Sequence, residues 1–161
     1  MPFTTTYANS ILNYTFSKVS QLTAPSAVYI GLCSNNPESD NGSITELSGG
    51  GYHRVMISQK GEMYPNLINL ASDRAIVNQY QINWSKATTD WPRVKGLFLS
   101  SSPTVGETTS IFFYGALELT EEQELAGGLL VEAGAVALFD PQTFKISFPA
   151  KDVTDEAVTS E

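Results

Sequence analysis

The chain has 161 residues, of which 42% are hydrophobic and 16% charged, and nine basic against seventeen acidic side chains give a net charge of −8. This length fits one domain, and so acidic a surface repels phosphate backbones, which argues against nucleic-acid binding. No run of about eighteen apolar residues and no basic stretch followed by an apolar core is present, so neither membrane spanning nor export is predicted, and we expect synthesis in a cytoplasm.

The first predicted element is a helix over residues 6–18. Tyr7, Ile11 and Tyr14 recur at spacings of four and three, which is typical of a helix whose apolar stripe lies on a core. Thr6 is the expected N-cap.

The apolar run Ala27–Cys33 predicts a strand that is buried on both faces. Cys33 is the only cysteine, which excludes an internal disulfide, and we interpret it as a small core residue. Residues 34–51 are rich in Asn, Asp, Ser and Gly, ending in a glycine triplet, and predict a long exposed loop. Residues 52–59 alternate in the two-residue period of a second strand.

Residues 60–73 are irregular and are compatible with a strand or with an excursion around the edge of the fold. Beyond them, Tyr80, Ile82 and Trp84 alternate with polar residues, and all three are expected to point inward.

Further strands are predicted at residues 94–99, with Leu97 and Leu99 on one face, and at residues 111–119. The acidic residues Glu121, Glu122 and Glu124 are expected to mark a turn.

Residues 129–139 have a helix-like composition, but their glycines disfavour a helix, so strands are predicted on either side of a bulge at Gly134. Residues 140–143 have turn chemistry, and Phe144, Ile146 and Phe148 alternate after them, which predicts a last hairpin.

About seven short strands at these spacings predict a mainly β fold with a short N-terminal helix, built as a sandwich or a barrel, and we expect an antiparallel β-sandwich. We expect residues 1–149 to form this single domain. Residues 150–161 are acidic and poor in apolar side chains, and are expected to form a flexible tail.

No pattern of catalytic or metal-binding residues is found. His53 is the only histidine and has no cysteine near it, so neither a zinc site nor a Ser-His-Asp triad is supported. Glu118 and the glutamates that follow it cluster near a turn, where solvated charge is the usual explanation for a carboxylate pair. We therefore predict no enzyme activity, no catalytic or metal residues and no cofactor.

Two binding hypotheses are weaker. The loop with Glu38, Asp40 and Glu46 has oxygen ligands that suit calcium but does not fit the EF-hand spacing. Trp91 is a possible stacking platform for a sugar, whereas Trp84 is expected in the core.

Several segments, in this order, resemble a family of small phage tail proteins that includes tail-fibre attachment, or collar, proteins. The resemblance covers about residues 3–138. The residues that carry it are Tyr7-Ala8-Asn9-Ser10-Ile11-Leu12-Asn13, Ala24-Pro25 before Val28-Tyr29-Ile30-Gly31-Leu32, Ser48-Gly49-Gly50-Gly51-Tyr52-His53-Arg54, residues 82–91 before the strand at 94–99, Phe113-Tyr114-Gly115-Ala116-Leu117, and a closing strand rich in glycine and alanine.

The resemblance implies a non-enzymatic virion protein with an immunoglobulin-like sandwich, which anchors tail fibres as a collar or adaptor. Its implied partners are other virion proteins of the tail tube, tail fibre or capsid and further copies of itself in a ring, with no nucleic acid and no membrane. The family pattern ends near Leu138, and the hairpin and acidic tail that follow depart from it. Capsid decoration and carbohydrate binding during host adsorption are the alternatives.

Overall fold

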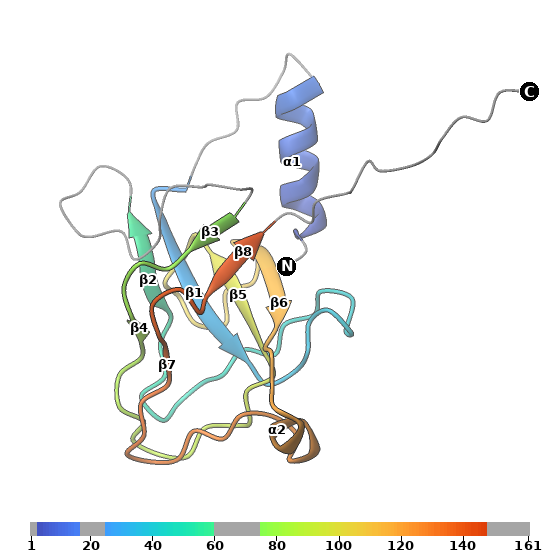
Figure 1. Cartoon of the computed structure of the whole chain (residues 1–161). Coiled ribbons are helices and arrows are strands. Elements are labelled where there is room, and N and C mark those ends of the chain that lie inside the picture. The colour runs from blue at the N-terminus through green and yellow to red at the C-terminus, as the bar shows by residue number, and fades with distance from the viewer. Residues whose placement is uncertain (1–2, 17–24, 60–74, 148–161) are drawn as a thin grey trace, which may run out of the picture.

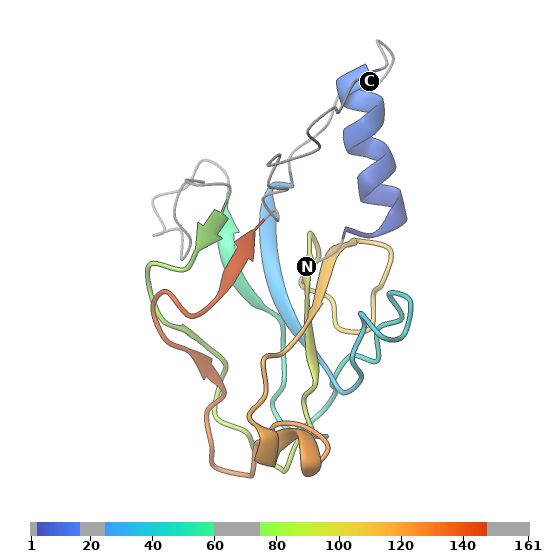
Figure 2. The same cartoon turned by 45° about the vertical axis from the view of Figure 1, so that its right-hand side comes forward.

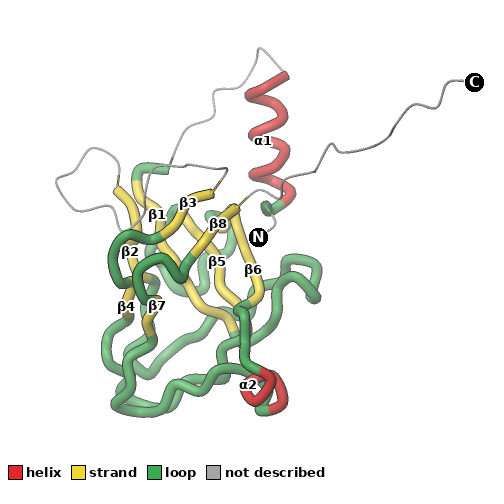
Figure 3. Tube along the Cα trace, in the orientation of Figure 1, coloured by secondary structure: helices red, strands yellow, loops and turns green. Residues whose placement is uncertain are grey.

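The computed structural model describes residues 3–16, 25–59 and 75–147, and within them the fold is mainly β, with antiparallel strands and a short N-terminal helix (Figures 1 and 3). This confirms the predicted fold class, while the immunoglobulin-like detail stays a prediction. The predicted irregular segment at 60–73, Phe148 and the predicted tail at 150–161 lie outside the described residues. The elements in chain order are α1 (Thr5–Phe16), β1 (Ala27–Cys33), β2 (Val55–Gln59), β3 (Ala75–Val77), β4 (Ile82–Asn83), β5 (Gly96–Ser100), β6 (Ile111–Ala116), α2 (Glu121–Leu125), β7 (Leu138–Phe139) and β8 (Lys145–Ser147).

A four-stranded antiparallel sheet with the order β2-β1-β5-β6 forms one layer of the fold. β1 has the predicted bounds, and its apolar run suits a central strand because most of its residues are buried. β2 begins at Val55 and not at Tyr52, because the Tyr52 amide donates to the Gly49 carbonyl at 2.9 Å in the turn that ends the preceding loop. β5 and β6 fall within two or three residues of their predicted bounds.

The contact between β1 and β5 depends on Gly31. A Cβ atom at this position would lie 2.2 Å from Cζ of Phe98, which is fully buried on β5. The absence of a side chain therefore allows the Phe98 ring to cover the β1 backbone.

The second layer is a long antiparallel ribbon made by the segment before β5 and the last described segment of the chain (Figure 1). The predicted final hairpin is wrong, because β8 pairs with β3 and β7 pairs with β4. The ribbon continues past these short strands through backbone hydrogen bonds, which join Trp84 to Ala137, Ala87 to Ala135, Trp91 to Val131 and Val94 to Leu129.

Asn78 explains why the turn at residues 140–143 does not reverse the chain into a hairpin. Its Oδ1 accepts from the Phe144 amide at 2.9 Å, and its amide donates to the Phe144 carbonyl at 3.2 Å. Its Nδ2 donates to the Asp140 carbonyl at 2.8 Å, so one buried side chain binds both ends of the turn. The turn is therefore a kink within the ribbon.

The core lies between the sheet and the ribbon. Leu97 and Leu99 share one buried face, as predicted, and Ile82 and Trp84 point inward. Tyr80 is exposed, contrary to prediction, because the chain bends at residues 79–80 and the alternation begins only at Ile82. The buried cluster comprises Ile30, Leu32, Leu47, Tyr52, Ile57, Ile82, Trp84, Ala87, Trp91, Val94, Leu97, Leu99, Phe112, Val131 and Phe144.

Two further predictions are corrected in the segment after β6. The predicted acidic turn is the short helix α2, because the Thr120 hydroxyl accepts from the Gln123 amide and the Gln123 side chain accepts from the Thr120 amide. Gly134, predicted at a bulge, adopts φ 89° in a turn closed by a 2.9 Å bond from the Ala135 amide to the Glu132 carbonyl. Of the strands predicted on either side of it, only β7 and an isolated bridge at Leu129 form.

Helix α1 is present as predicted, and of its predicted stripe Tyr7 packs against the core whereas Tyr14 does not. Thr4, not Thr6, precedes the first turn, and its hydroxyl accepts from the Tyr7 amide at 3.4 Å. Tyr7 packs on the body of the protein, whereas no residue of the helix is buried and Tyr14 is exposed. Both views show the helix rising away from the strands (Figures 1 and 2).

Candidate assembly surfaces

The chemistry-bearing side chains do not converge on one place. His53 is exposed, and its Nδ1 lies 3.3 Å from the Gly51 carbonyl. Within residues 3–16, 25–59 and 75–147, no group of three or more His, Cys, Asp or Glu side chains is placed to hold a metal ion.

Cys33 is a buried core residue, as expected. Burial raises the pKa of its thiol to about 12, and the nearby Glu46 carboxylate adds to this shift. The thiolate needed for nucleophilic chemistry is therefore scarce at neutral pH.

Both tryptophans lie in the core, and Trp91 is only 4% exposed. Its Nε1 donates to the Gly50 carbonyl at 2.8 Å, and its ring meets Tyr52 edge to face at 5.5 Å. A Cβ at Gly50 would lie 2.9 Å from Cδ1 of Trp91, so the glycine lets the loop close over the indole. Trp91 thus offers no exposed face on which a sugar can stack.

The acidic loop residues proposed for calcium have separate partners. The Asp40 carboxylate accepts from Asn35 at 2.7 Å, and the Glu38 carboxylate accepts from the Ala116 amide at 3.3 Å. Glu46 pairs with Arg54 at 2.8 Å. These contacts close the loop onto the sheet instead of directing the three carboxylates at one point.

Arg54 is the most highly connected polar side chain that sequence reasoning missed. Its guanidinium binds both carboxylate oxygens of Glu46 at 2.8 Å and donates to the Ser100 hydroxyl at 2.8 Å. It also donates to the carbonyls of Ser102 and Glu107, and lies 4.9 Å from the centre of the Phe98 ring. Its place two residues after Tyr52 in an alternating segment is the signal that could have identified it, but nothing local indicated Glu46 as the partner.

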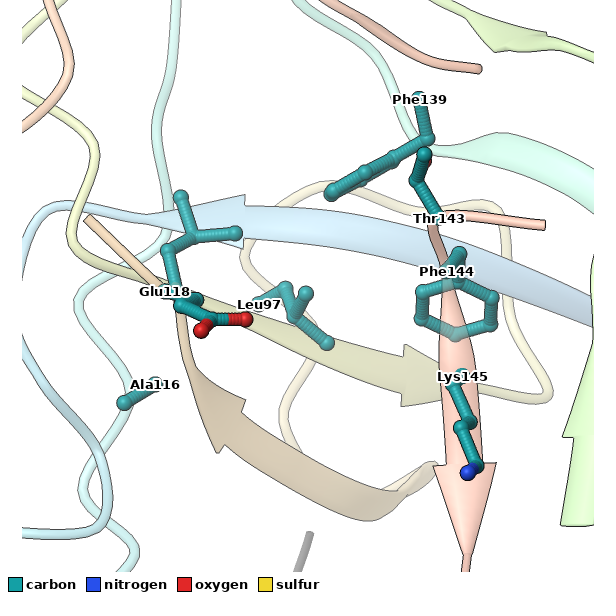
Figure 4. Close-up of a pocket in the computed structure, with 8 residues that line it drawn as sticks. Leu97, Ala116, Glu118, Phe139, Thr143, Phe144 and Lys145 are labelled. Atoms are coloured by element: carbon teal, nitrogen blue, oxygen red, sulfur yellow. The ribbon is translucent and has the colours of Figure 1, made fainter. Parts of the chain in front are cut away.

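A groove of about 410 Å³ opens between the end of β6 and the start of β8 (Figure 4). Glu118 lies on one side of it and Lys145 on the other, with Leu97 and Phe144 between them (Figure 4). A shallow groove with an apolar floor and two opposite charges on its rim suits contact with another polypeptide better than catalysis.

Two groups of exposed large apolar side chains lie elsewhere. One is the distal part of α1, with Leu12, Tyr14 and Phe16, and Phe16 is 83% exposed. The other is the end formed by α2 and the ribbon (Figure 1), with Leu125, Leu130, Val136 and Leu138. Exposed apolar patches of this kind mark protein contacts.

Comparison with known protein families indicates the class of protein to which the chain belongs. A family model described as Podophage GP4 fiber I protein gp80 matches residues 2–139, most of the chain. The chain therefore belongs to this family and is a structural, tail fibre-related phage protein. No curated protein matches it. Among the residues described, no helix has the length and hydrophobicity to cross a bilayer.

Proposed function

We propose that this member of the podophage fiber I family is a non-enzymatic collar or adaptor of the phage tail, which anchors tail fibres in the virion. The observation that carries the proposal is the family match over residues 2–139. It agrees with the resemblance to phage tail proteins found in the sequence, which is confirmed at the level of a tail fibre-related protein.

The described polar residues support a structural role. Arg54, Glu46 and Asn78 are used to hold loops and strands together, and Cys33 and Trp91 are buried. An adaptor needs such a rigid body with contact surfaces left open, and the exposed apolar side chains of α1 and of the α2 end provide these surfaces.

The partners in this proposal are other virion proteins, such as those of the tail tube or tail fibre, and further copies of the chain in a closed ring. Cyclic symmetry is the usual way in which identical subunits close an assembly. The proposal treats residues 1–149 as one domain, followed by the acidic segment 150–161.

Immunogold electron microscopy of intact virions tests the location directly, with an antibody raised against the purified chain. Label at the tail is the expected result. Label over the head would replace the collar with capsid decoration, and virions without label would overturn the proposal of a virion component.

A further inference from the structure

Among the residues that the structure describes, helix α1 contacts the body at its N-terminal end. The Phe3 ring lies 4.2 Å from that of Phe113, and the Tyr7 ring lies 5.2 Å from that of Phe112. Beside this contact, a cavity of about 490 Å³ separates the first turns of the helix from the body. Its lining is rich in hydroxyl groups, such as those of Ser10 and Ser101. Within the described part of the chain, the ring contacts that hold α1 to the body therefore lie at its start.

The unsupported half of α1 is apolar on two opposite sides. Leu12 and Phe16 are four residues apart and lie on one face, where they are 53% and 83% exposed. Tyr14 is 57% exposed and lies two residues from each, and two residues turn a helix by about 200°, so its side chain points the other way. A helix with apolar side chains on two opposite faces can be covered by one neighbour on each face.

The helix also lacks the means to be stable alone. It has 12 residues, and isolated helices shorter than roughly 12–15 residues are marginal in water. Its distal half therefore needs partners on both of its apolar faces.

Charge indicates which partner fits. The whole chain carries −8, so copies repel each other wherever their charged surfaces meet. The sequence of α1, TTYANSILNYTF, has no charged residue at all. The helix is thus a surface on which two copies meet without repulsion between like charges.

We propose that α1 packs between two further copies of this chain, with the Leu12 and Phe16 face of one copy against the Tyr14 face of the next. The two faces differ and lie on opposite sides, so the contact is heterologous and repeats until a ring closes. The inference rests on the ring in the proposed function and assigns the surface that forms it.

Analytical ultracentrifugation of the full chain tests the proposal. The wild-type protein is expected to sediment as a species larger than a dimer, and Phe16→Glu is expected to lose this species completely. Tyr80→Glu is the matched control, because Tyr80 is 51% exposed between β3 and β4, outside both apolar surfaces described above, and this variant should assemble as the wild type does. A monomeric wild-type protein, or a Phe16→Glu protein that still assembles, would overturn the proposal.

Cysteine cross-linking tests the arrangement of the faces. Cys33 is buried and does not compete, so new thiols report on the helix alone. A mixture of the Phe16→Cys and Tyr14→Cys proteins is expected to form disulfide-linked pairs, whereas neither variant alone does so. Efficient pairing of Phe16→Cys with itself would show a two-fold contact and overturn the ring. A monomeric protein that nevertheless labels the tail would overturn this inference and the ring but leave the tail location of the proposed function in place. An assembled protein without virion label would support the interface and overturn the proposed function.

Discussion

Helix α1 and the surroundings of Arg54 differ in where their side chains find contacts. The Arg54 guanidinium is buried, and its hydrogen bonds reach Glu46, Ser100 and the loop at residues 102–107. The distal half of α1 has exposed apolar side chains and no buried residue. The buried Arg54–Glu46 pair thus finds its partners within the body, whereas the apolar side chains in the distal half of α1 are exposed and, in our proposal, are covered by further copies of the chain.

The comparison separates what holds the monomer together from what is available for assembly. A substitution near Arg54 should change the stability of the monomer, and a substitution at the end of α1 should change association without changing stability. Each of the following predictions would break or sharpen this division.

The largest effect is expected for Arg54→Met. Removing one member of a buried ion pair leaves the Glu46 carboxylate buried without its partner, which typically costs about 3–5 kcal/mol. Urea unfolding of the full chain measures this loss. Arg93→Met is the control, because Arg93 is exposed and has a single bond of 3.1 Å to the Gly128 carbonyl. Equal stability of the two variants would show that Arg54 is not central to the body.

Gly31→Ala comes next. The new methyl group would lie 2.2 Å from Cζ of the Phe98 ring, which is buried and cannot move away. Overpacking of this kind costs about 1–3 kcal/mol. The double variant Gly31→Ala with Phe98→Leu should be less unstable than the sum of the two single changes, as measured by a double-mutant cycle. Additive losses would show that the two residues are not in contact.

A smaller, pH-dependent effect is expected from Glu107. Hydrogen bonds from the Ser110 and Thr109 hydroxyls lower its pKa from 4.5 to about 2. Because the folded pKa is depressed, the stabilisation is complete above a pH of about 4.5 and is lost as the pH falls toward 2. The midpoints of urea unfolding of the wild type and Glu107→Gln should therefore differ above this window and converge below it. A difference that stays constant across the window would contradict the assignment.

The smallest effect on stability is expected for Phe16→Glu. Exposed substitutions usually change stability by no more than about 0.5 kcal/mol, and this side chain is 83% exposed. Urea unfolding of the dilute protein should therefore match the wild type, although association is lost. A large loss of stability in the dilute protein would show that α1 belongs to the core of the monomer.

The sequence predicted best those elements whose pattern is local. β1 has the predicted bounds because its apolar run is continuous, and Leu97 and Leu99 share a face because strands alternate strictly. The prediction of a final hairpin was wrong because the partner of a strand depends on contacts that are distant in the sequence. Here these are the contacts of Asn78 with Asp140 and Phe144, which lie 62 and 66 positions away.

The candidate surfaces were harder to predict. The spacing of Tyr7, Ile11 and Tyr14 indicated a helix with an apolar stripe. Such a stripe is found both in helices that pack on a core and in helices that pack on another chain, so the pattern does not distinguish the two. The pairing of Arg54 with Glu46 joins a strand end to a loop and has no periodic signature. Family membership did agree with the sequence resemblance, while the collar role within it stays a prediction.

Hydrogen–deuterium exchange at two protein concentrations tests the contrast most directly, because it measures both regions in one sample. We predict that the amides of α1 become more protected from exchange as the protein concentration rises. The amides of β1 and β5 are expected to be equally protected at both concentrations. Protection of α1 that does not depend on concentration would contradict the account, because it would show that the monomer alone stabilises the helix.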